Sequence, residues 1–134
     1  MPPTSSPTPV RQSRTSVREK TKEAVQEEKQ VIVHCRYTCH NPYGMLIRVW
    51  PSTYLIAKDP QHTSDLVHVE NIPLAPAWMP VGAGETARFT LIFTGLPGSC
   101  LKFDLAEIIP QSGGFHVPDI LRNDMDVYEV EIPD

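Results

Sequence analysis

Residues 85–105, ETARFTLIFTGLPGSCLKFDL, constrain the fold more than any other stretch of this chain. Every second residue from 89 to 93 is a large apolar one, and this period of two is typical of a half-buried β-strand. Residues 95–98, Gly-Leu-Pro-Gly, interrupt the pattern, and a second alternating run begins at residue 101. We therefore expect two successive strands that present six large apolar side chains to one core. These are Phe89, Leu91, Phe93, Leu101, Phe103 and Leu105.

Shorter alternating segments recur through the rest of the chain from residue 31 onward, and turn-forming residues separate them about every ten positions. The segments are Val31–Cys39, Met45–Trp50, Thr53–Ala57, Leu66–Glu70, Phe115–Leu121 and Val127–Ile132. No helical periodicity lies between them. This pattern predicts an all-β fold, an antiparallel β-sandwich of the immunoglobulin-like (Ig-like) kind with about seven strands. A β-barrel is the main alternative.

The first 30 residues have a different composition. Residues 1–14 are rich in proline, serine and threonine, which predicts disorder. Residues 15–30 consist mostly of helix formers, and Ser16 and Glu19 have the spacing of a capping box, but the apolar stripe is thin. We therefore expect a disordered or partly helical N-terminal tail over residues 1–30, followed by a β-sandwich domain over residues 31–134.

Charge and hydropathy exclude some kinds of partner. Residues 31–134 carry twelve Asp or Glu against six Lys or Arg, and this acidic balance repels phosphate backbones. We therefore expect no nucleic-acid binding. No apolar run approaches the ~20 residues that span a bilayer, so we expect no membrane insertion. The N-terminus lacks an apolar signal core, which favours the cytoplasm; the periplasm or secretion would follow if a signal peptide had been removed.

His34, Cys35, Cys39 and His40 place four potential metal ligands within seven residues. In an extended strand, which rises ~3.3 Å per residue, the two cysteines lie about 13 Å apart, whereas thiolates on one zinc ion lie about 4 Å apart. We therefore expect the cysteines to pack as small apolar groups, with no metal site. A disulfide between Cys35 and Cys100 stays open as an alternative that would suit a secreted domain.

The candidate binding residues lie in Asn71–Gly84, where three prolines and two glycines argue against regular structure. The segment is nevertheless rich in apolar residues, so it either folds over the edge of the sandwich or forms a contact surface. We expect Leu74, Trp78 and Met79 to bind a partner, with Trp78 and Met79 as anchors, because aromatic and methionine side chains are common at interfaces. In the alternative, Trp78 plugs one end of the sandwich.

Several short motifs resemble a pattern found in short, uncharacterised bacterial β-sandwich domains. They are Thr90-Leu91-Ile92-Phe93, Leu96-Pro97, Phe103-Asp104-Leu105-x-Glu107, Trp50-Pro51-x-Thr53-Tyr54-Leu55 and Arg122-Asn123. The resemblance covers about residues 31–132. It implies an Ig-like fold, and it implies no activity, because that group of domains has none assigned.

The sequence offers no catalytic motif: neither a G-x-S-x-G elbow nor an HExxH helix occurs. We therefore expect a non-catalytic binding or protein-interaction module without a cofactor, whose partner is another protein or a second copy of the chain. The alternative is a metal-binding or redox protein that uses His34, Cys35, Cys39 and His40. A carrier of a small molecule held between the sheets is a third possibility.

Overall fold

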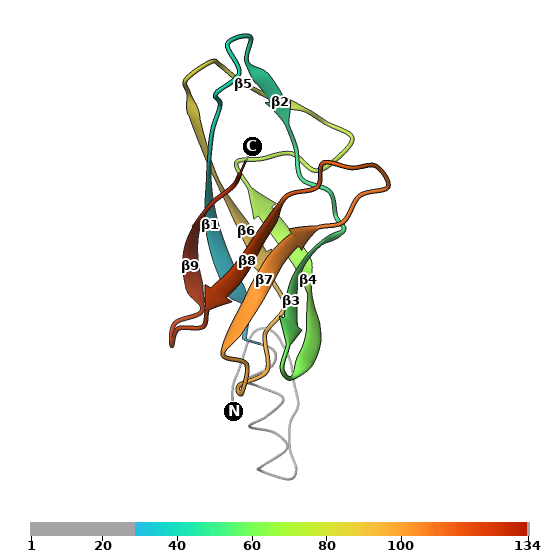
Figure 1. Cartoon of the computed structure of the whole chain (residues 1–134), viewed down its shortest axis with the longest axis vertical. Helices are drawn as coiled ribbons and strands as arrows, with labels where there is room; N and C mark the ends of the chain where they lie inside the picture. Colours follow the sequence, from blue (N-terminus) through green and yellow to red (C-terminus); the bar gives the residue numbers. More distant parts are fainter. Residues whose placement is uncertain (1–28, 134) are drawn as a thin grey trace, which may run out of the picture.

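The computed structural model describes residues 29–133, so most of the expected N-terminal tail lies outside the described residues (Figure 1). Residues 29–133 form nine strands and contain no helix, which confirms the all-β class. The strands are β1 (Val31–Thr38), β2 (Met45–Ile47), β3 (Thr53–Lys58), β4 (Gln61–Glu70), β5 (Met79–Val81), β6 (Thr86–Phe93), β7 (Lys102–Glu107), β8 (His116–Leu121) and β9 (Val127–Glu131).

Seven of these strands form one sheet in the order β8-β7-β3-β4-β6-β1-β9. All neighbours in it are antiparallel except β1 and β9, which are parallel. β4 joins the two halves of the sheet, because its first half pairs with β3 and its second half with β6. The register shifts between Leu66 and His68, next to the point where β4 changes partner, and an irregularity of this kind allows a long strand to bend.

The two edge strands of this sheet come together at one end of the molecule (Figure 1). The short turn at residues 122–126 leads from β8 directly into β9. Across the interior, the rings of Phe103 on β7 and Tyr128 on β9 meet edge to face with their centroids 5.0 Å apart. The sheet therefore curls until its opposite ends enclose one core. β2 and β5 form a separate two-stranded sheet at the other end of the molecule (Figure 1).

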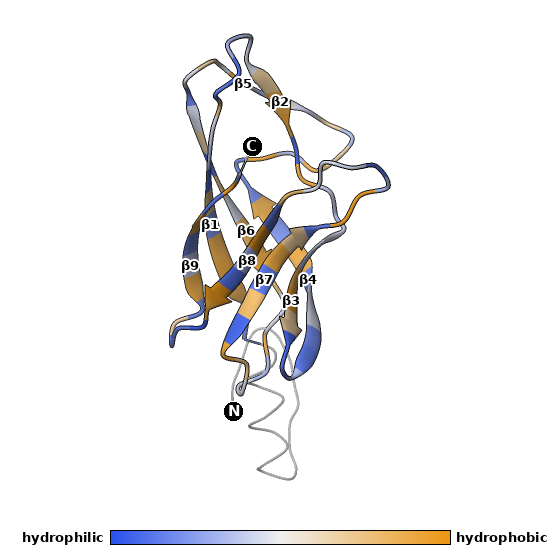
Figure 2. Ribbon diagram, viewed as in Figure 1, coloured by the Kyte–Doolittle hydropathy of each residue, from blue (hydrophilic) through white to orange (hydrophobic). Residues whose placement is uncertain are grey.

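Apolar side chains of the curled sheet form one buried core. Figure 2 colours the ribbon by hydropathy and shows hydrophobic positions along the strands of the main sheet. Five of the six predicted core residues of β6 and β7 are buried: Phe89, Leu91, Phe93, Phe103 and Leu105. Alternation along each strand thus identified the inner face correctly, although β6 and β7 are not neighbours, since β3 and β4 lie between them.

The sixth predicted core residue, Leu101, is 77% exposed, so that prediction was wrong. β7 begins only at Lys102, and Leu101 therefore lies beyond the end of the sheet, where no strand covers it. Residues 71–84, where we expected no regular structure, also contain β5. A tight hairpin turn, in which Lys58 pairs with Gln61, connects β3 to β4.

Candidate functional site

An apolar cavity of about 490 Å³ lies between residues 45–50 and the loop that follows β7. Its size falls within the ~300–1,000 Å³ of typical ligand pockets. Most of its lining is aromatic or aliphatic, and it draws on β1, β6 and the segments on either side of β2. The aromatic lining residues are Tyr37, Trp50, Trp78, Phe89 and Phe115.

Arg48 holds Trp78 at the rim of this cavity. The guanidinium carbon of Arg48 lies 3.7 Å from the ring centroid of Trp78 and 5.3 Å from that of Trp50. Its Nη1 donates a hydrogen bond of 3.1 Å to the carbonyl oxygen of Pro76. A cation stacked in this way stabilises the ring by about 1 kcal/mol. The Nε of Arg48 is buried and has no hydrogen-bond partner within residues 29–133, so the cavity wall contains a donor without an acceptor.

Glu107, at the end of β7, is the one anionic side chain among the described residues that line the cavity. Its Oε2 accepts a hydrogen bond of 3.0 Å from the backbone N–H of Trp50. Burial raises the pKa of Glu107, and the opposing effects of backbone hydrogen bonds from Trp50 and Phe115 and of the charge on Arg48 do not cancel that rise. Glu107 thus connects the end of β7 to the chain that leaves β2.

The three predicted binding residues lie in different surroundings. Trp78 lines the cavity and is 52% exposed. Met79 belongs to β5 and packs partly buried against the core. Leu74 is 41% exposed and bridges to Val49 through the backbone, and it does not line the cavity. The structure therefore brings only Trp78 to the cavity.

Arg48 and Glu107 were missed in the sequence. Each is an ordinary charged residue in a strand-like segment, and the backbone bond from Trp50 to Glu107 joins parts of the chain that no local pattern relates. The short alternation Arg48-x-Trp50 was the one available signal, because it places a cation and an aromatic ring on the same side of an extended chain.

The histidine and cysteine residues of β1 are not gathered into a site. Cys35, Cys39 and Cys100 are buried free thiols, and each sulfur lies within hydrogen-bond reach of a backbone carbonyl oxygen. Burial raises the pKa of the Cys35 thiol to about 12, which disfavours the reactive thiolate. His34 lies on the exposed face of β1 and bonds to Thr90 Oγ1 at 2.9 Å. Within the described part of the chain, no three His, Cys, Asp or Glu residues are grouped so as to hold a metal ion.

One serine and one histidine lie close enough to resemble a catalytic pair. His62 Nε2 is 3.1 Å from Ser64 Oγ. Ser64 is fully buried, however, and its hydroxyl donates to the carbonyl oxygen of Gly95 at 3.0 Å. A nucleophile needs access to substrate and a proton that its base can remove. These contacts instead connect β4 to the turn after β6.

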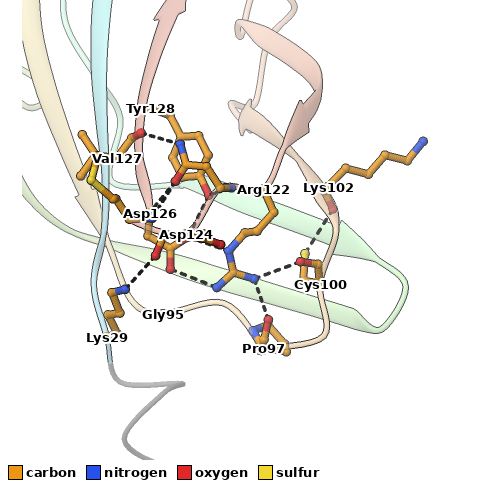
Figure 3. Close-up of polar contacts among 12 residues, drawn as sticks. Lys29, Gly95, Pro97, Cys100, Lys102, Arg122, Asp124, Asp126, Val127 and Tyr128 are labelled. Carbon is orange, nitrogen blue, oxygen red and sulfur yellow. Dashed lines mark hydrogen bonds and ion pairs between the residues drawn. The ribbon is translucent and has the colours of Figure 1, made fainter.

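A buried ionic network closes the end of the molecule opposite to β2 and β5 (Figures 1 and 3). Arg122 binds Asp126 through two hydrogen bonds, Nε to Oδ1 at 2.6 Å and Nη2 to Oδ2 at 3.0 Å. Its Nη1 donates to the carbonyl oxygens of Pro97 and Cys100 at 2.7 and 3.1 Å. The Tyr128 hydroxyl donates to Asp126 Oδ1 at 2.8 Å. Every contact is internal, so the network holds three segments together.

A second groove of about 510 Å³ is lined by residues of β6, β1 and β9. Arg36, Arg88, Glu129 and Glu131 line it, so charges of both signs are balanced there. Arg36 and Glu131 already pair at 3.0 Å with more than half of the Glu131 side chain exposed. We therefore regard the apolar cavity beside residues 45–50 as the candidate binding site.

No family model matches this chain, and no curated protein or solved structure matches it. Residues 29–133 contain no helix that is long and apolar enough to cross a membrane.

Proposed function

We propose that this protein is a non-catalytic protein-interaction module with an Ig-like β-sandwich fold, and that its partner binds at the cavity beside residues 45–50. The change of partner along β4 supports the sandwich, because residues 61–65 pair with β3 and residues 66–70 with β6, which divides the main sheet into two halves. The ring of Phe103 in one half packs on that of Tyr128 in the other. Three buried free thiols favour a reducing compartment, and we infer a cytoplasmic location from them.

The position of Trp78 is the main observation that supports a binding site at this cavity. Its ring lines an apolar cavity while 52% of the residue stays exposed, and Arg48 holds it in place. Tryptophan and arginine are the residues most enriched among those that dominate binding energy at interfaces. A side chain that merely plugged the end of the sandwich would be buried by its neighbours, so this exposure favours a contact role.

The test compares the wild-type chain with Trp78→Ala. Binders are selected on the wild type from a phage-displayed library of random peptides, and self-association is measured by analytical ultracentrifugation. We expect Trp78→Ala to weaken peptide binding, or dimerisation if it occurs, by about tenfold or more. Its melting temperature should fall by only a few degrees, because the side chain is half-exposed and its contact with Arg48 contributes only about 1 kcal/mol.

Leu121→Ala is the matched control, because Leu121 is an exposed apolar residue, 74% accessible, at the far end of the molecule. It should bind as the wild type does. A large fall in the melting temperature of Trp78→Ala would indicate a plug and contradict the proposal. A wild-type chain that yields no binder and does not self-associate would contradict it as well.

A further inference from the structure

The pairing of β2 with β5 leaves one edge of β2 open. Met45 pairs with Val81, Leu46 with Pro80 and Ile47 with Met79. In an antiparallel pair, positions alternate between those that exchange two hydrogen bonds and those that exchange none. Proline has no N–H, so Leu46 and Pro80 cannot be a hydrogen-bonded pair. Met45 and Ile47 therefore bond to β5, and the N–H and C=O of Leu46 point away from it.

The residues that follow continue this alternation. Val49 bonds through both its N–H and its C=O to residues 73–75, on the β5 side. Trp50 turns its N–H to the other side, where Glu107 accepts it. Between these points, the backbone groups of Leu46 and Arg48 have no partner within residues 29–133. The open edge is thus short and ends at the carboxylate of Glu107.

This edge borders the cavity. All six residues from 45 to 50 line it. Successive side chains of an extended segment point to opposite faces, so a cavity on one face would contact only every second residue. Six consecutive lining residues indicate a cavity that lies along the edge of the strand, beside its unpaired backbone groups.

We propose that an extended peptide segment of a partner protein adds as a strand to residues 45–50, places an apolar side chain in the cavity and presents an acidic side chain to Arg48. This inference rests on the proposed function and names its mode of recognition. Strand addition takes its affinity from main-chain hydrogen bonds and its specificity from pockets for alternate side chains. Residues 45–50 provide both, next to the exposed ring of Trp78.

The positive charge of Arg48 favours an acidic residue in the added strand. Arg48 is the one cation among the described residues that line the cavity. Glu107, the one anion among them, accepts the N–H of Trp50 with its Oε2 at the end of the edge, and no hydrogen bond joins it to Arg48 within the described residues. A carboxylate on the added strand would form a charge-assisted hydrogen bond with the terminal nitrogens of the Arg48 guanidinium, because the Nε is buried.

The first test modifies the peptide and leaves the full chain unchanged. A peptide is selected on the wild type from the phage-displayed library, and its backbone nitrogens are methylated one at a time. We expect the affinity to fall by about tenfold or more at alternate positions and little between them, because alternate N–H groups face the edge. A peptide that is lost on Trp78→Ala but shows no such alternation would overturn strand addition and leave the proposed function standing.

The second test modifies the edge. Leu46→Pro removes the N–H that faces the cavity, and Leu46→Ala keeps it, so the pair separates the donor from the side chain. We expect Leu46→Pro to bind the peptide about tenfold more weakly than Leu46→Ala, and Arg48→Gln to lose the preference for an acidic residue. Equal affinities for the two Leu46 variants would overturn the inference. A wild-type dimer that Leu46→Pro dissociates would show that the occupant is a second copy, which also overturns it.

Discussion

Asp126 is a carboxylate that is only 3% exposed, and it depends on Arg122 and Tyr128 for every side-chain contact described above. Removing one partner of a buried ion pair leaves the other without compensation. We therefore expect Asp126→Asn to lower the free energy of unfolding by about 3 kcal/mol in denaturant titrations. Glu131→Gln is the control, because its pair with Arg36 is exposed and should contribute nothing measurable. Equal effects of the two substitutions would contradict this prediction.

The same carboxylate should make stability depend on pH. Burial acts to raise the pKa of Asp126, but the hydrogen bonds from Arg122 and Tyr128 outweigh it and hold that pKa below its usual range. A carboxyl with a lowered pKa stabilises the fold above its unfolded pKa of about 3.9, and this contribution is lost as the pH falls through the folded pKa. We expect the stability of the wild type to fall below about pH 4, and the curve for Asp126→Asn to be flatter there. Parallel curves would be inconsistent with this role.

At the scale of the strands, the sequence predicted inner faces well and strand ends poorly. The alternation around Phe89 and Phe103 depends on local geometry, so it could be read directly from the chain. Leu101 continues the same alternation but is exposed, because β7 begins only at the next residue, Lys102. β5 was missed because Pro80 argues against a strand, whereas the structure places that proline opposite Leu46, where no N–H is required.

Because of the geometry of β2, proline substitutions at Leu46 and Ile47 should have different effects on the free energy of unfolding. The N–H of Leu46 faces the open edge, whereas that of Ile47 bonds to β5. Proline is tolerated in edge strands where its missing N–H would face solvent. We expect Ile47→Pro to lower the free energy of unfolding by at least about 1 kcal/mol more than Leu46→Pro, because it also loses a hydrogen bond. Chemical denaturation measures both, and a more harmful Leu46→Pro would contradict the register.

The residues of the candidate site also differ in how far the local sequence could predict them. Trp78 was found because a tryptophan in a proline-rich segment is conspicuous in any sequence. Arg48 and Glu107 gain their roles only when the end of β2 meets the end of β7. That meeting depends on which strands become neighbours, and alternation carries no information on strand order. The position of β1 between β6 and β9, the latter from the far end of the chain, was unpredictable for the same reason.

Across the whole molecule, stability should be uneven. β1 and β6 are paired on both sides and contribute fully buried residues such as Val33 and Leu91, whereas β2 is three residues long and largely exposed. Amides of β1 and β6 should therefore exchange with solvent only through global unfolding, and those of Met45 and Ile47 should exchange faster, on the order of tenfold or more, through local opening.

Hydrogen exchange followed by nuclear magnetic resonance measures this difference residue by residue. Added peptide should slow the amides of Leu46 and Arg48 most, because strand addition gives those N–H groups their first acceptors. Uniform protection of all nine strands in the free protein would contradict a locally mobile small sheet. If the peptide slowed the exchange of other amides but not those of Leu46 and Arg48, it would bind elsewhere on the molecule. If the amides of Leu46 and Arg48 slow as expected, only the small sheet of β2 and β5 would change its mobility when the peptide binds, and the seven-stranded sheet would keep the same conformation.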